Sequence, residues 1–352
     1  MKLITQTFPS VFETSFGFVE NSAKDQLHGI KVKKDNTWYI VGDLAKKNGI
    51  SAARITNAAP TEEDFDILFR SALVNLSGKL TAPVTITLGF PFSTYNAFKA
   101  AAQQYLSKRH FLVESDSQTF NVSGKIKKET FDIERFEIIP EIVGGIIALK
   151  KIYEQNMPDN FLAISFGFGT LEGIMASKDG LINRTSFSSH GIQYAINNLS
   201  RELNKKHYLE LKNEHQLDDI FMKGSFFANR KRVDIAELKE ELLSQYYREI
   251  VSPMIRRHIT EDDLESCGKI YLMGGGAHYH TLINAVKDEF ESFIPVEVVD
   301  EPEKLVSAGY LYNSLRLSDN YPSRCAGIDI GNAYTMVSTF SEGNNSYSEF
   351  KI

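Results

Sequence analysis

Two hydrophobic patterns alternate along the chain and predict an α/β protein. Short apolar runs bounded by glycine, proline or polar residues predict buried strands at residues 84–89, 161–166 and 269–273. Longer segments carry apolar residues three and four positions apart, which is the spacing of an amphipathic helix. Such segments occupy residues 61–79, 94–108 and 235–258. Strands that alternate with helices in this way are typical of parallel or mixed sheets covered by helices.

Three glycine-rich turns stand next to predicted strands. Their sequences are ISFGFGTLEG (residues 164–173), YLMGGGAH (271–278) and CAGIDIGNAYTMVSTF (325–340). The last predicts a strand, a tight turn and a returning strand, followed by little more of the chain. Glycine lets backbone N–H groups approach a phosphate, and Asp329 just before the turn is placed to hold a hydrated magnesium ion. An ordinary surface hairpin is the alternative interpretation of this stretch taken alone.

The three turns together resemble those of the actin superfamily. GIDIGNAYT resembles the first phosphate loop, ISFGFGTLEG the second phosphate loop, and YLMGGGAH the adenosine-binding turn. Gly89-Phe90-Pro91 and Pro140-Glu141 also resemble stretches of ParM-like and archaeal actin-like proteins. The first phosphate loop normally opens the chain, whereas here it comes last. The resemblance covers nearly the whole chain and implies a circularly permuted order of the usual elements.

The resemblance implies a fold and a division of the chain. The expected fold is α/β, actin-like (ribonuclease H-like), two-lobed and circularly permuted. Lobe I would comprise residues 1–155 and 318–352, with a small subdomain at about 20–80. Lobe II would comprise residues 156–317, with a small subdomain at about 200–262.

The resemblance also implies a site for ATP and Mg²⁺ between the lobes, with GTP left open. The implied magnesium contact is Asp329, and the implied catalytic residue is Glu141, which would orient the attacking water. The expected nucleotide-binding residues are Asp329, Gly331, Asn332 and Thr335 of the first loop, Ser165, Gly167, Gly169 and Thr170 of the second, and Gly274, Gly275 and Gly276 of the third.

Two positions depart from the family pattern. The first phosphate loop usually ends in Lys, where this chain has Met336, and the second usually begins with Asp, where it has Ser165. Each lost charge removes one electrostatic contribution to the transition state, and comparable deletions slow catalysis by roughly 10²–10³-fold. Backbone amides and Asp329 would still bind a nucleotide, so hydrolysis is expected to suffer more than binding.

Composition narrows the function further. A length of 352 residues suits two lobes. A formal charge of −6 argues against nucleic-acid binding by the whole surface. The two cysteines favour a reducing compartment and support neither disulfides nor zinc. We find no apolar run long enough for a signal peptide or a membrane span, so the expected location is the cytoplasm.

These observations leave three functions on one fold, and a fourth interpretation outside it. The first is a cytoplasmic ATPase that assembles head to tail into a homopolymer, with an adaptor protein left unidentified. The second is a nucleotide-binding switch or scaffold that hydrolyses poorly, as the departures at Ser165 and Met336 would favour. The third is a small-molecule kinase or phosphatase of the same superfamily. The fourth is an unrelated α/β protein with coincident glycine turns.

Overall fold

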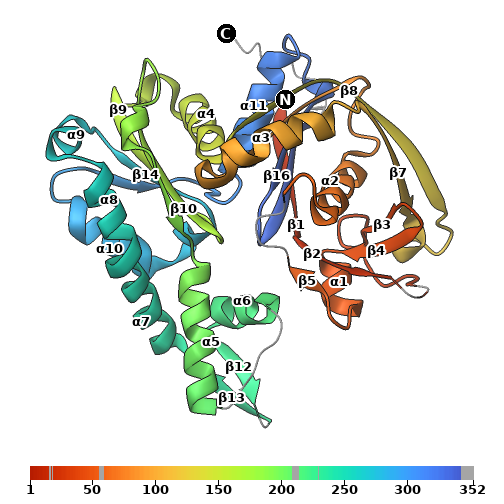
Figure 1. Ribbon diagram of the computed structural model, residues 1–352, viewed down its shortest axis with the longest axis horizontal. Helices are drawn as coiled ribbons and strands as arrows, with labels where there is room; N and C mark the ends of the chain where they lie inside the picture. Colours follow the sequence, from red (N-terminus) through yellow and green to blue (C-terminus); the bar gives the residue numbers. More distant parts are fainter. Residues whose placement is uncertain (16, 18, 55–58, 208–213, 229, 342–352) are drawn as a thin grey trace.

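The structure is a computed structural model that describes residues 1–352 except 16, 18, 55–58, 208–213, 229 and 342–352. The described elements form two halves, each built around one sheet (Figure 1). The ten-stranded sheet has the order β1-β17-β16-β6-β8-β7-β3-β4-β2-β5, and the five-stranded sheet has the order β11-β10-β9-β14-β15. Strands and helices alternate as the hydrophobic pattern predicts.

The first half of the ten-stranded sheet joins both ends of the sequence. Its strands are β1 (Lys2–Pro9), β17 (Tyr334–Ser341), β16 (Cys325–Ile330), β6 (Val84–Phe90) and β8 (Ile126–Pro140). β17 pairs antiparallel with β1 and with β16, while β16, β6 and β8 run parallel. The hairpin β16–β17 is last in the sequence, yet it lies inside the sheet between β1 and β6.

The long strand β8 carries the sheet into its second half. That part contains β7 (His110–Asp116), β3 (Lys31–Lys34), β4 (Thr37–Val41), β2 (Val11–Thr14) and β5 (Ala53–Arg54). The helices of this side are α1 (Asp43–Asn48), α2 (Glu63–Leu76) and α3 (Phe92–Leu106). The apolar face of α2, which includes Phe65, Phe69 and Leu73, is fully buried against these strands. This confirms the helix predicted over residues 61–79.

The five-stranded sheet consists of β11 (Phe187–His190), β10 (Thr170–Ser177), β9 (Asn160–Phe166), β14 (Ile270–Met273) and β15 (Val296–Val298). Residues 181–184, which follow β10, do not form a strand. Leu181 makes a single bridge to Ala176, and Asn183–Thr185 forms a 3-10 turn. The Thr185 hydroxyl accepts the N–H of Met175 and stabilises this turn, so the next strand begins only at Phe187.

Further helices belong to the same half of the molecule as the five-stranded sheet. They are α5 (Gln193–His207), α6 (Glu214–Lys223), α7 (Ala236–Tyr246), α8 (Ser252–His258), α9 (Glu261–Ser266) and α10 (His280–Phe290). A small hairpin, β12 (Ser225–Ala228) and β13 (Lys231–Asp234), follows α6. A π-helical segment, Tyr247–Val251, joins α7 to α8, so the long helix predicted over residues 235–258 is present with one distortion.

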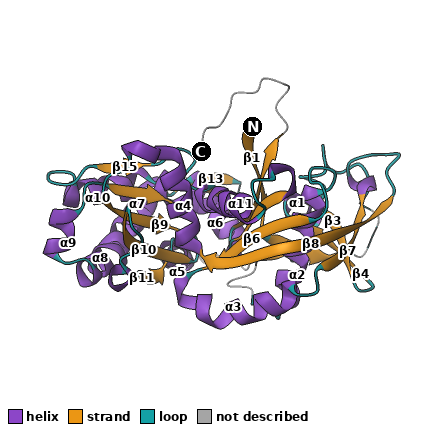
Figure 2. Cartoon of the chain, turned by 90° about the horizontal axis from the view of Figure 1, so that it is seen from above, coloured by secondary structure: helices purple, strands orange, loops and turns teal. Residues whose placement is uncertain are grey.

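Two helices lie between the sheets. These are α4 (Glu141–Tyr153) and α11 (Leu305–Leu317), which Figure 2 shows in the middle of the molecule. α4 contacts β9 and β10 on one side and β6 and β8 on the other. The two helices cross so closely that a Cβ at Gly309 would lie 1.7 Å from the carbonyl oxygen of Gly144. This contact packs the two halves around a common centre.

The described part of the chain contains no helix that is long and apolar enough to cross a membrane.

Candidate functional site

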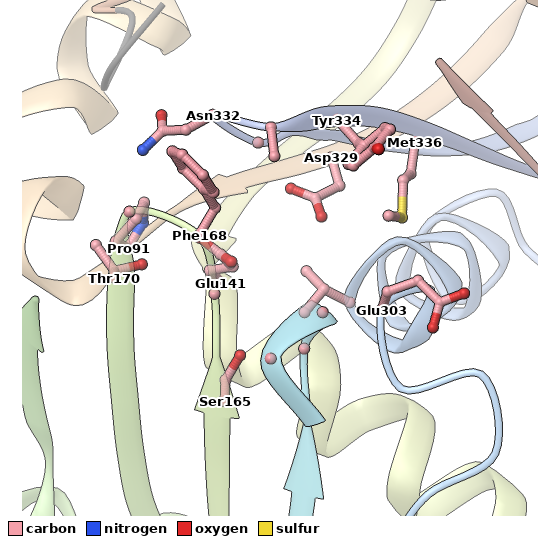
Figure 3. A pocket seen from close by; sticks show the side chains of 18 of the residues that line it. Pro91, Glu141, Ser165, Phe168, Thr170, Glu303, Asp329, Asn332, Tyr334 and Met336 are labelled. Atoms are coloured by element: carbon pink, nitrogen blue, oxygen red, sulfur yellow. The ribbon is translucent and has the colours of Figure 1, made fainter. Parts of the chain in front are cut away.

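A cavity of about 450 Å³ lies between the two sheets. Its lining includes the turns of two hairpins, a glycine-rich turn after β14, the first residues after β6 and β8, residues of α6 and the segment that leads into α11. Figure 3 labels part of this lining, including Asp329, Glu141 and Ser165. We call β16–β17 the first hairpin and β9–β10 the second hairpin. Each sheet therefore contributes one hairpin to the same cavity.

The first hairpin places alternate residues of its strands toward the cavity. Asp329 and Met336 are direct cross-strand partners and both line the cavity (Figure 3). Ser10 supports the turn from behind, because its hydroxyl donates to the carbonyl oxygen of Gly331 at 2.6 Å. Thr335 lies on the opposite face, where it is fully buried and 2.9 Å from the Ser10 hydroxyl. Strand side chains alternate between faces, so Thr335 braces the turn and does not line the cavity.

The second hairpin turns its amides toward the cavity. The carbonyl groups of Gly167, Phe168 and Gly169 accept the N–H groups of residues 192, 193 and 191, just before and at the start of α5. In a trans peptide the C=O and the next N–H point in opposite directions. The N–H groups of residues 168 and 169 therefore point away from α5, on the side where the turn lines the cavity.

The two hairpin turns meet across the cavity. A Cβ built on Gly169 would lie 2.0 Å from Nδ2 of Asn332, so the Asn332 side chain would have to shift. The absence of a side chain at position 169 thus permits this approach, and the two turns enclose the cavity from opposite sheets.

The third turn closes another wall of the cavity. Gly274 has a φ of +83°, and its N–H donates to the carbonyl of Pro302 at 2.8 Å. Gly275 is exposed, and a Cβ there would meet nothing within 4 Å. Gly274, Gly275 and Gly276 all line the cavity, next to the start of a 3-10 turn. A flat ring could lie against this backbone without meeting a side chain.

Comparisons with known proteins agree with this arrangement. Residues 2–144 match the family described as "Actin like proteins N terminal domain". The structure of Ta0583, an archaeal actin homolog, is 19% identical with a TM-score of 0.67, and a non-polymerisable pCBH ParM mutant is 19% identical with a TM-score of 0.73. For both, the match covers 88% of this chain and 92% of the other. The chain has the actin-like fold.

More distant structures share the actin-like fold too. MreB5 of Spiroplasma citri, solved with ADP, is 12% identical with a TM-score of 0.59, over 83% of this chain and 89% of the other. No curated protein matches the sequence.

Carboxyl groups gather at the floor of the actin-like cavity. Asp329 comes from the first hairpin, and Glu141 lines the cavity from the first turn of α4. Burial raises the pKa of Asp329 to about 7. Burial, followed by the negative charges of Asp329 and Glu172, raises the pKa of Glu141 well above its usual range. The surroundings of these groups thus disfavour negative charge on them, and a bound cation would offset that penalty.

The residues present fit a hydrated magnesium ion bound together with a nucleotide. Within the described residues, no group of three or more His, Cys, Asp or Glu is arranged to hold a metal ion by itself. Magnesium does not need one, because it usually keeps several waters and binds one or two carboxylates plus phosphate oxygens. Lys304 is the only Lys or Arg among the lining residues that the structure describes, and it pairs with Glu301. Asp329 is the lining carboxylate nearest in sequence to the first phosphate turn.

Most of the residues expected from the sequence line the cavity, and Thr335 does not. Sequence reasoning missed Asp218 and Met222, which line the cavity from α6. Next to Asp218, Asp219 forms a 2.8 Å ion pair with Lys46 of α1 on the other half. Nothing in the charged run around α6 distinguishes these residues before the halves come together.

Proposed function

We propose that this actin-like protein binds a magnesium nucleotide in the cavity between its two halves, hydrolyses it slowly and assembles head to tail into filaments in the cytoplasm. The observation that carries the proposal is the meeting of the two glycine turns, with Asp329 and Glu141 on the floor beneath them. An archaeal actin homolog with this fold was solved with ADP, and a ParM of Clostridium botulinum was solved as a filament. These relatives support the proposal by likeness of fold.

Each part of the cavity has a role in this proposal. The turn amides of the two hairpins bind the terminal phosphates, and the turn at Gly274–Gly276 holds the nucleoside. Asp329 binds magnesium through its waters, and the ion supplies charge neutralisation at the phosphates. Glu141 accepts a hydrogen bond from the attacking water and keeps it in line with the terminal phosphate.

The same geometry explains why hydrolysis would be slow. Met336 is the cross-strand partner of Asp329 and lines the cavity. It occupies the position at which the first phosphate loop of the family usually ends in lysine. Ser165 faces the cavity at the place of an expected aspartate. The neutral side chains at these two positions cannot stabilise charge that develops on the transferred phosphoryl group. Binding through backbone amides does not depend on either side chain.

A permuted chain order is part of the proposal. β1, β17 and β16 form one antiparallel meander in which Lys2 pairs with Ser341, so the first strand lies next to the last strand that the structure describes. Joining them and opening the chain before β16 would give the order hairpin first, then β1. We propose on this basis lobe I as residues 1–155 with 318–352 and lobe II as residues 156–317.

The test is sedimentation of the purified protein with no nucleotide, with Mg-ATP, with Mg-GTP, and with a non-hydrolysable ATP analogue. Released phosphate is counted in the same tubes, and nucleotide binding is measured separately with a fluorescent analogue. We expect nucleotide-dependent pelleting with slow phosphate release. Absence of nucleotide binding would reject the proposal as a whole. Binding without pelleting under any condition would reject filament assembly alone.

The second candidate is a nucleotide-binding switch without useful hydrolysis. The neutral residues Ser165 and Met336 favour it over a kinase, for which the described cavity shows no catalytic acid or base more specific than Glu141. Pelleting with both nucleotides and no released phosphate would support the switch.

A further inference from the structure

One buried acid beside the cavity has no role in the function proposed above. Glu172 stands on β10 of the second hairpin, directly across from Ser165, and is only 1% exposed. Direct partners on antiparallel strands point to the same face of a sheet. Glu172 therefore points to the side from which Ser165 lines the cavity, but it is not itself a lining residue.

The carboxylate of Glu172 reaches the other half of the molecule. Its Oε1 accepts the backbone N–H of Phe92, the first residue of α3, at 2.5 Å. Burial raises the pKa of this carboxyl group, and the backbone N–H groups of Phe92 and of Ile142, in the first turn of α4, act in the opposite direction. The other oxygen, Oε2, is buried without a hydrogen-bond partner. One side chain from the second hairpin is thus bonded to the N-terminus of α3 and lies beside the first turn of α4, a helix that packs against β10.

These two amides need an acceptor from outside their helices. The first N–H groups of a helix have no partner within it, and the N-terminal end carries a partial positive charge. Neither α3 nor α4 has a capping side chain at its own N-cap, because Pro91 and Pro140 occupy those positions. Glu172 supplies an acceptor to the first amide of α3 and lies beside the first turn of α4. A polar group is costly to bury unless it is paired, so this placement requires a compensating interaction.

Glu141 is the residue next to Ile142 and the first residue of α4. Any shift of the second hairpin that moves the Glu172 carboxylate would therefore move the first turn of α4 and, with it, the Glu141 side chain. We propose that Glu172 is a positioning residue that links the second hairpin to the first turn of α4 and so sets where Glu141 lies. This inference rests on the proposed function of Glu141 and deepens it.

Through Glu172, a movement of the turn Gly167–Gly169 would be transmitted to the side chain of Glu141. The turn Gly167–Gly169 ends where β10 begins, and Glu172 is the third residue of that strand. A nucleotide that moves this turn toward the first hairpin would move Glu172 and, with it, the first turn of α4. Misplacing a catalytic group by about 1 Å can cost about 10²-fold in rate, so a small movement suffices.

Glu172→Leu tests the link, because leucine has a similar size and accepts no hydrogen bond. We expect phosphate release to fall about 10- to 100-fold, while the dissociation constant for the nucleotide changes less than about twofold. Glu172→Gln keeps an acceptor oxygen and should retain most of the rate. Ser188→Ala is the matched control, since Ser188 pairs with Glu172 on the next strand and its buried hydroxyl has no hydrogen-bond partner.

A double-mutant cycle separates positioning from a general structural role. In a Glu141→Gln background, Glu172→Leu should slow phosphate release by less than about twofold, because the residue through which it acts is already gone. Equal effects of Glu172→Leu with and without Glu141 would overturn the inference. So would a parallel loss of binding and turnover, or a rate no lower than that of Ser188→Ala.

Hydrogen exchange of the nucleotide-free protein tests the contact of Glu172 with the helix N-termini, and it does not depend on enzymatic activity. The amides of Phe92 and Ile142 should be protected in the wild type and in Glu172→Gln, and exchange faster in Glu172→Leu. If leucine prevents folding, Glu172→Asp retracts the carboxylate by one methylene and should show the same loss of protection. Unprotected amides in the wild type would overturn the inference. If the wild type binds no nucleotide, the proposed function and the positioning of a catalytic group both fail, whereas protected amides would still establish the link.

Discussion

The two hairpins at the cavity have the same plan with the acid on opposite strands. In the first hairpin Asp329 pairs with Met336, and in the second Ser165 pairs with Glu172. Each pair is separated by the same length of chain, and each contains one acid and one uncharged residue. The acid belongs to the incoming strand of the first hairpin and to the outgoing strand of the second.

This difference changes what each acid can contact. Asp329 lines the cavity, where a hydrated cation can reach it. Glu172 is turned to the helix N-termini beside the cavity and its Oε1 is occupied by the Phe92 amide. The acids of two similar hairpins thus have different roles. Asp329 is available to a ligand, whereas Glu172 contributes to the packing of the two halves. The lesson is that an acid beside a phosphate turn acquires its role from the neighbours that the fold gives it.

The largest expected effect comes from removing the acid that faces the cavity. Asp329→Asn should slow magnesium-dependent phosphate release by about 10²–10³-fold, because it removes a charge that acts on the transition state. Ser165→Ala at the corresponding place of the second hairpin should change the rate less than about threefold, since a neutral group is exchanged for another. Phosphate release across a magnesium titration measures both. Equal losses in the two variants would contradict the difference between the hairpins.

A smaller effect is expected from forcing the hairpin turns apart. Gly169→Ala places a methyl group against Asn332 and should weaken nucleotide binding about tenfold, or 1.4 kcal/mol. Gly17→Ala is the control, because its methyl group would meet no atom within 4 Å and Gly17 does not line the cavity. Titration of a fluorescent nucleotide measures both affinities. Asn332→Ser should relieve the clash in the Gly169→Ala protein, and tight binding by Gly169→Ala alone would show that the turns do not meet.

The smallest expected effect is on stability against pH. Burial raises the pKa of Glu172 from 4.5 to about 8 despite the amides of Phe92 and Ile142, so between these values the folded protein holds a proton that the unfolded chain releases. Stability from this group therefore falls as pH rises through that window. Glu172→Gln should reduce this loss of stability when unfolding in urea is measured from pH 5 to pH 8, because glutamine does not titrate.

A paired carboxyl group outside the cavity should change stability with pH in the opposite direction. The Arg184 guanidinium, bonded to Asp263, holds the pKa of that carboxyl well below its usual value of 3.8. Its stabilising effect is present above that value and is lost as pH falls below it. Asp263→Asn should therefore lower the free energy of unfolding at neutral pH and flatten its decline in acid.

A Glu172→Gln protein whose stability depends on pH as that of the wild type does would show that Glu172 does not titrate in this way.

Much of the architecture follows from local patterns in the sequence. The helix at Glu63–Leu76 and the strand at Val84–Phe90 are set by the period of their apolar residues, which each element must bury on one face or both. The three glycine turns are visible because few other residues permit such close backbone approach. Asp329 is recognisable because it directly precedes such a turn. These features depend on residues near each other in the chain.

The tertiary structure decided what depends on distant neighbours. Thr335 belongs to the first phosphate turn by sequence, yet its position on β17 turns it toward Ser10 and away from the cavity. Glu172 lies in a recognised glycine stretch, but its contacts with Phe92 and Ile142 exist only after two helices from the other half pack against it. Asp218 reaches the cavity only because α6 folds over it. A local pattern fixes the direction of a side chain within its element, whereas the partner it meets is fixed by how the two sheets pack around α4 and α11.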